Sequence, residues 1–169
     1  MLDVILKRIA SSPVLIYIIR CCIGFLIGYK LYITYPDFEL FWTLLSIILV
    51  ISPEEKDTRR LSIERFKSNF IGSAVAMVML FFLEPNVYTI ILGIFVTIIV
   101  CRLFNVLNMA RVALVALLII MVQPHQTGFV EAPIYRFGSV AVGCIIGLLI
   151  VVLTSIIFRP LKRKFGIPY

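Results

Sequence analysis

Arginines inside or at the edge of apolar segments are the residues of this sequence best suited to chemistry. Arg20 lies within a long apolar segment, and Arg65 and Arg136 each stand at the start of another. A guanidinium in hydrocarbon costs at least about 2.5–3.5 kcal/mol on insertion scales, so it needs a counter-charge, hydrogen-bond acceptors or water. Arginines in such positions indicate a pathway or a binding site for anions.

Arg20 is the most deeply placed of these cations. Gly24 and Gly28 follow it at four-residue spacing, so the three residues share one face of a helix. Small-residue faces pack against other helices, which would turn Arg20 toward protein and away from lipid. Every carboxylate falls in a loop or at a segment edge, so no acidic partner is expected at the depth of Arg20. Two explanations are open: a mobile anion or a water-filled cavity satisfies Arg20, or its side chain reaches cytoplasmic headgroups or backbone carbonyls.

Several features of the sequence recur 71 residues further along. The repeated pairs are Pro53 and Pro124, Arg65 and Arg136, Phe66 and Phe137, Ser68 and Ser139, and Gly72 and Gly143. Pro, Arg, Ser and Gly at one fixed offset are harder to obtain by chance than apolar matches. The chain is therefore expected to contain two copies of one unit.

Arg65 and Arg136 occupy equivalent places in the two copies, and small residues follow both. We expect them to line positively charged vestibules at the two mouths of a pathway, while headgroup anchoring is the alternative. The residues expected to pack helices closely are Gly24, Gly28, Gly72, Gly143 and Gly147.

Further residues are weaker candidates for the same pathway. Lys30, Lys67, Arg102 and Arg111 are basic, and Arg111 adjoins a short apolar segment. Trp42 begins another short segment, where an aromatic usually belongs to the membrane interface. A platform for an aromatic solute is the alternative role for Trp42.

Other kinds of chemistry are not indicated. The four cysteines lie in apolar runs without metal-site spacing, and the lone His125 is expected in a solvated loop. The sequence contains no Ser/His/Asp set, paired buried carboxylates or phosphate loop. We therefore expect neither an enzyme nor a protein with a metal or another cofactor.

The composition places these residues in a membrane. The chain is 62% apolar and 15% charged, with a mean hydropathy of +1.09. No water-soluble domain needs so much apolar side chain, so an integral membrane protein is expected, embedded in the lipid bilayer. The net charge of +7 forms no extended patch that would indicate nucleic acid.

The length permits about six spans of roughly 20 residues and no separate soluble domain. We expect an all-α fold, a single membrane domain over 1–169, with helices at about 13–33, 39–52, 62–83, 87–104, 109–123 and 134–158. A short amphipathic helix on the membrane surface is expected before them, and a basic cytoplasmic tail, 159–169, after them.

The charge distribution predicts the orientation. Thirteen of the sixteen Lys and Arg residues fall on the side that holds both termini. Basic residues prefer the cytoplasmic side, so we expect a protein of the cell (inner) membrane with both termini in the cytoplasm. Repeat 1 (about 13–83) and repeat 2 (about 84–158) each hold three spans, an odd number, so the repeats should have inverted topology. The short second and fifth spans occupy equivalent positions, which is typical of a binding site or pathway; thin packing helices are the alternative.

The run from Trp42 through Ser46 to Pro53, with Arg65 after it, carries a family resemblance. Together with the copy at Arg136, it resembles the fusaric acid resistance and aromatic acid exporter family and, distantly, the plant aluminium-activated malate transporters. Family members usually follow the arginine with Gly-Thr and then Gly, whereas this chain differs after both arginines. The resemblance, over about 13–158, implies a six-helix unit that functions as a homodimer or higher homo-oligomer, with basic residues along an anion pathway.

These observations lead to two functional hypotheses. The first is a membrane protein that moves an anionic small molecule outward, an aromatic or small organic carboxylate. A channel or facilitated carrier is favoured, because no titratable acid or histidine is expected within the spans. The second is a non-transporting membrane subunit that recruits a soluble cytoplasmic partner through the basic stretch from Lys56 to Lys67.

Overall fold

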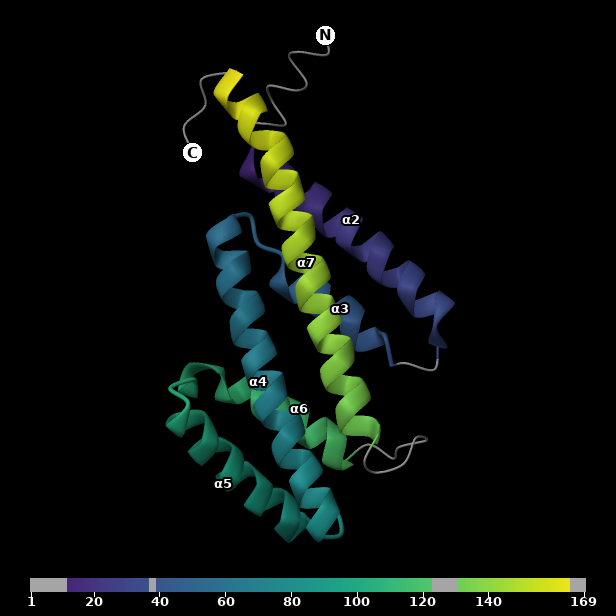
Figure 1. Ribbon diagram of the computed structural model, residues 1–169, viewed down its shortest axis with the longest axis vertical. Coiled ribbons are helices and arrows are strands. Elements are labelled where there is room, and N and C mark those ends of the chain that lie inside the picture. Colours follow the sequence, from purple (N-terminus) through teal and green to yellow (C-terminus); the bar gives the residue numbers. More distant parts are fainter. Residues whose placement is uncertain (1–11, 37–38, 123–130, 165–169) are drawn as a thin grey trace. The chain divides into compact units, whose positions relative to one another are not determined.

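The computed structural model describes residues 12–36, 39–122 and 131–164, which form helices joined by short turns (Figure 1). The helices are α2 (Pro13–Thr34), α3 (Phe41–Val50), α4 (Glu55–Phe82), α5 (Val87–Leu103), α6 (Ala110–Val122) and α7 (Glu131–Lys164), with a 3₁₀ turn η2 (Leu107–Met109) before α6. The predicted all-α class is confirmed. The N-terminal amphipathic helix and His125 fall outside the described residues, while the predicted tail is helical as far as Lys164.

The helices differ in their capacity to cross a bilayer. Two of those described, over Val14–Thr34 and Pro133–Phe158, are long and apolar enough to do so by length and composition. The apolar helices Phe41–Val50, Val87–Leu103 and Leu107–Val122 are shorter. At 1.5 Å per residue, α3 extends about 15 Å, roughly half of a 30 Å hydrocarbon layer. The described residues thus contain two clear candidate spans, fewer than the six predicted.

Local sequence explains where the first helix begins. The side chain of Ser12 accepts a hydrogen bond from the backbone N–H of Leu15 (3.4 Å), and Pro13 takes the first helical position. Serine satisfies an N–H that has no partner within the helix, and proline has no N–H to lose. The predicted start of this helix is therefore confirmed.

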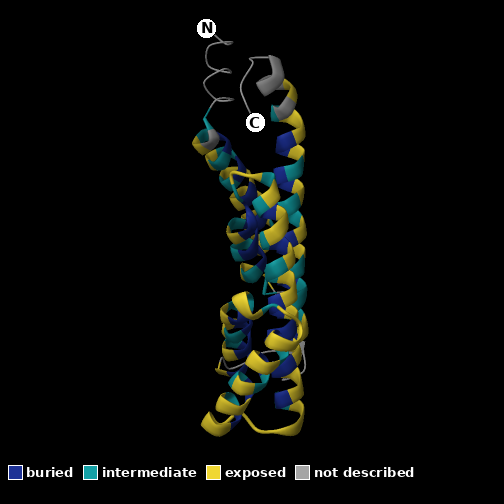
Figure 2. Ribbon diagram, turned by 90° about the vertical axis from the view of Figure 1, so that its left-hand side faces the viewer, coloured by how far each residue is buried: buried dark blue, intermediate teal, exposed yellow. Residues whose placement is uncertain are grey.

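The chain forms two compact units, 1–62 with 142–169 and 63–141. Parts of α4 and of α7 belong to each unit. Buried and exposed positions alternate along the helices of both units (Figure 2). Large apolar side chains are frequent among the exposed residues. An exposed apolar side suits a protein surrounded by lipid, where apolar atoms need no burial.

In the first unit, glycines bring helices into close contact. A Cβ atom on Gly24 would lie 2.7 Å from Ile51 and 2.8 Å from Ile47, so α2 lies directly on α3. On α7, a Cβ atom on Gly143 would lie 2.6 Å from the carbonyl oxygen of Thr43. Gly147, one turn later, faces Ile47, so α3 and α7 run parallel.

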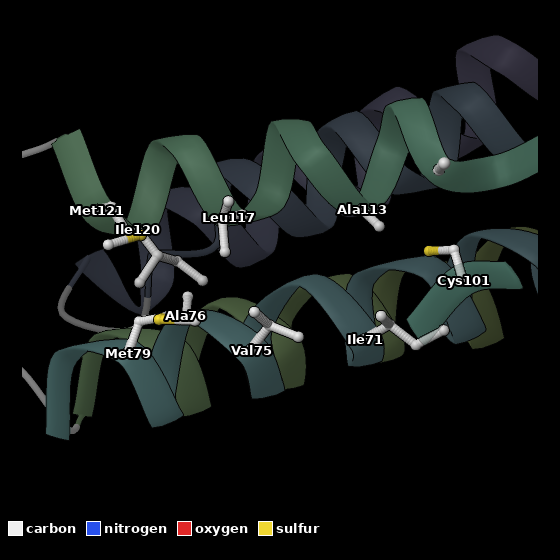
Figure 3. Packing of buried hydrophobic residues seen from close by; sticks show 10 residues of the cluster. Ile71, Val75, Ala76, Met79, Cys101, Ala113, Leu117, Ile120 and Met121 are labelled. Carbon is white, nitrogen blue, oxygen red and sulfur yellow. The ribbon is translucent and has the colours of Figure 1, made fainter. Parts of the chain in front are cut away.

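In the second unit, α4 and α6 form the main apolar core (Figure 3). Ile71 lies near Ala113 at one end of this contact, and Met79 lies near Met121 at the other, so α4 and α6 are also parallel. A Cβ atom on Gly72 would collide with the carbonyl oxygen of Ala113. The helix backbones therefore touch at this point.

Candidate functional site

Arg20 lies in the first unit and is buried, with 4% of its surface exposed. Its Nε donates a hydrogen bond to Oγ1 of Thr154 (2.9 Å), and its Nη2 donates one to Oγ of Ser155 (2.9 Å). Its Nη1 donates to the carbonyl oxygens of Ser52 (3.0 Å) and Pro53 (2.7 Å). The guanidinium thus connects α2 to α7 and to the turn between α3 and α4.

These partners decide between the two explanations for Arg20. Four of its five N–H groups bond to protein oxygens, and Glu55 adds a favourable Coulombic interaction. Backbone carbonyls, the second explanation, are therefore what the structure shows. The burial of Arg20 does not by itself require a mobile anion.

Arg65 and Arg136 are brought to one level of the second unit. Their neighbours Phe66 and Phe137 are in ring contact, with centroids 5.2 Å apart. Turns that touch cannot lie at opposite faces of a hydrocarbon layer about 30 Å thick. The expectation of two vestibules at opposite mouths is therefore wrong. Arg136 is 3% exposed, whereas Arg65 is half-buried.

Beside this aromatic contact lies an open cavity of about 360 Å³, which we call the Lys67 cavity. Its walls are apolar, with the rings of Phe66, Phe70 and Phe104 among them, and Lys67 is its charged residue. The three phenylalanines and the lysine are exposed. Aromatic surface and one cation are thus available together to a ligand.

The far wall of the Lys67 cavity is shaped by the end of α5. Asn105 adopts a left-handed conformation (φ 55°), which asparagine tolerates better than most residues. The N–H of Val106 then donates to the carbonyl oxygen of Cys101 (2.9 Å), and that of Asn105 donates to Arg102 (3.1 Å). This Schellman ending reverses the chain and places Phe104 and Val106 on the cavity.

A second open cavity of about 160 Å³, the Ser73 cavity, adjoins the first. Phe70 and Ala74 line both cavities, and Pro133 and Phe137 of α7 contribute to the second. The ring of Phe70 lies edge-on to that of Phe137, with centroids 5.4 Å apart. Apolar cavities thus lie on either side of Phe70.

The other predicted pathway residues lie elsewhere. Lys30, Arg102 and Arg111 are exposed, and Trp42 is half-buried with its ring edge-on to Phe41 (5.6 Å). None of these residues lines the two cavities.

Residues of the cavities were mostly missed by sequence reasoning. The signal was a pair of phenylalanines one helical turn apart, Phe66 and Phe70, enclosing Lys67 and followed by the small Ala74. Phe104 carried no local signal, because it reaches the cavity only through the ending of α5.

The helical architecture, the exposed apolar side chains and the close glycine contacts define the class: an all-helical protein suited to lipid, with an open aromatic-walled cavity. A family model described as fusaric acid resistance protein-like matches residues 19–150, and the chain belongs to this family. The predicted resemblance to that family is confirmed, and a membrane transport or resistance function follows from it at a coarse level. The resemblance to plant malate transporters is not shown. Neither the curated proteins nor the solved structures contain a match to this chain.

Proposed function

We propose that this protein carries anions across the cell (inner) membrane, exporting aromatic or small organic carboxylates by a channel-like or facilitated route. The observation that carries the proposal is the Lys67 cavity, in which phenylalanine rings and the side chain of one lysine line the same space. Family membership supports it, since a function in transport or resistance is expected of the family.

The chemistry of the cavity suits an aromatic acid. A ring of the solute can stack on or stand edge-on to Phe66 and Phe104, and each such pair is worth about 0.5–1.5 kcal/mol beyond buried area. Its carboxylate can pair with Lys67 beside apolar walls, where the attraction is stronger than in bulk water. A volume of about 360 Å³ lies at the lower end for ligand sites, which favours a one-ring acid.

Internal contacts support an inverted repeat within this protein. Phe66 and Phe137, one from each repeat, touch each other, which is the kind of contact that a two-fold axis produces. A second correspondence lies in the glycine contacts: Gly72 meets Ala113 and Ala116, while Gly143 meets Thr43 and Ser46. Each contact joins the third helix of one repeat to the second helix of the other.

The helix directions agree with six alternating segments. Second and sixth segments should run parallel in that topology, as should third and fifth, and α3 with α7 and α4 with α6 do so. The proposal also places both termini in the cytoplasm and assembles two copies of the chain into a homodimer. Inverted repeats of this kind commonly place a solute site between their halves.

A flux assay on Lys67 tests the function. In proteoliposomes, Lys67→Gln should raise the KM for benzoate about tenfold, the equivalent of losing 1.4 kcal/mol, while Lys67→Arg retains most of the activity. Uptake of benzamide, which lacks the charge, should not respond to Lys67→Gln.

Arg102→Gln is the matched control, because Arg102 is an exposed cation of α5 that does not line the cavity. Equal loss in both variants would assign the effect to overall charge. Absence of benzoate flux in the wild-type protein would contradict transport and favour a subunit that recruits a soluble partner.

A further inference from the structure

We infer that Phe70 is a movable partition between the Lys67 and Ser73 cavities, and that it controls the passage of an aromatic acid from one to the other. The inference rests on the proposed function and adds a specificity-determining residue to it. Its basis is that Phe70 and Ala74 are the two residues, among those the structure describes, that line both cavities.

The ring of Phe70 is weakly held. Its side chain is 55% exposed, and its ring lies edge-on to that of Phe137. Such a contact contributes about 0.5–1.5 kcal/mol beyond the area that the ring buries, so it adds little to the cost of moving this half-exposed ring. Ala74, one turn further along α4, has only a methyl group, which leaves room beneath the ring once it moves.

The Ser73 cavity has apolar walls, and the hydroxyl of Ser73 is buried behind them. Ser73 is 4% exposed, and its Oγ has no hydrogen-bond partner among the described residues. An unsatisfied buried hydroxyl costs about 1–3 kcal/mol, which a solute oxygen or a bridging water would recover once the Ser73 side chain rotates toward the cavity. Six residues separate Ser73 from Lys67, a rise of about 9 Å along α4. In the proposed orientation this direction is outward.

Opposite substitutions at the partition test the inference. Phe70→Ala should join the cavities and strengthen the binding of biphenyl-4-carboxylate, a two-ring acid, about tenfold relative to benzoate. The same variant should speed benzoate flux several-fold. Ala74→Leu should fill the passage and slow flux several-fold with the Kd for benzoate unchanged.

Phe95→Ala is the matched control, since Phe95 is an exposed phenylalanine of α5 that lines neither cavity. Binding is measured by calorimetry on detergent-solubilised protein. Each variant must first match the wild-type protein in its gel-filtration elution volume and its helical content. If Phe70→Ala does not, Phe70→Leu replaces it. The inference is overturned if the Phe70 and Ala74 variants behave like Phe95→Ala in both assays.

Binding and flux separate the two proposals. If Phe70→Ala binds biphenyl-4-carboxylate more tightly but the wild-type protein shows no benzoate flux, the partition is supported and transport is contradicted. If the wild-type protein transports benzoate and neither Phe70→Ala nor Ala74→Leu changes that flux, transport is supported and the partition is contradicted. Wild-type protein that neither binds nor transports benzoate, with no gain in Phe70→Ala, would overturn both.

Discussion

A buried arginine in a membrane protein can be a ligand for an anion or a tie between helices, and the two roles differ in what the guanidinium touches. Arg20 donates to two carbonyl oxygens and two hydroxyl oxygens from separate segments. Such bonds to a charged group contribute about 1.5–3 kcal/mol each, and they leave little donor capacity for a solute. These hydrogen bonds favour a structural role for Arg20, whereas the exposed Lys67 is available to a ligand.

Replacing Arg20 should lower stability more than it changes anion affinity. Arg20→Met leaves the carbonyls of Ser52 and Pro53 without their donor, so we expect a loss of about 3 kcal/mol or more. The measurement is thermal unfolding followed with a thiol-reactive dye, since Cys101 and Cys144 are buried and react on unfolding. Arg102→Met should leave the midpoint nearly unchanged. An unaltered midpoint in Arg20→Met with lost benzoate binding would instead make Arg20 a ligand.

At the scale of the elements, backbone contact through glycine determines which helices pair. Gly72 lies on the carbonyl oxygen of Ala113, and Gly143 lies on that of Thr43. Without a hydrophobic driving force between helices in lipid, close packing at small residues is a principal source of association. The pairing of α4 with α6 thus depends on Gly72, and the pairing of α7 with α3 depends on Gly143.

Alanine at these two glycines should be destabilising in similar measure. A Cβ atom at Gly72 or Gly143 meets backbone that cannot rotate away, so we expect a cost of about 1–3 kcal/mol for each variant. Gly138→Ala is the internal control, because a Cβ atom there meets nothing within 4 Å. Alanine at that position should be neutral or stabilise α7 by up to about 1 kcal/mol. Thermal unfolding measures all three, and a uniform response would show that the contacts do not matter.

For the whole molecule, the main question is how many of these helices cross the bilayer. Only two of those described are long and apolar enough by themselves, yet the parallel pairs of helices fit six alternating segments. Short helices can be accommodated where they are covered by protein, or where the bilayer thins around them.

Labelling of single cysteines tests the crossing of α4 and its neighbours. In a cysteine-free background on intact cells, Lys30→Cys and Glu84→Cys should react with a membrane-impermeant maleimide. Lys56→Cys and Arg102→Cys should react only after permeabilisation. Reaction of Lys56→Cys and Glu84→Cys from the same side would mean that α4 does not cross, and the inverted topology would fail.

The sequence by itself determined the class of protein and the helices. Apolar runs and local capping predicted α2 and α6 to within a residue or two, because those signals act between residues a few positions apart. The sequence also predicts a repeat, since an arginine precedes both Phe66 and Phe137.

Tertiary structure alone decided what these residues touch. The hydroxyl that accepts from Nε of Arg20 lies 134 residues away, on Thr154, and no local pattern distinguishes such an acceptor from an anion. The Lys67 cavity likewise needs α4 and the end of α5 side by side before Phe104 can face Lys67. Helix formation depends on near neighbours in the chain, whereas burial, pairing and cavities depend on which distant segments pack together, and the spacing of residues along one helix does not specify that partner.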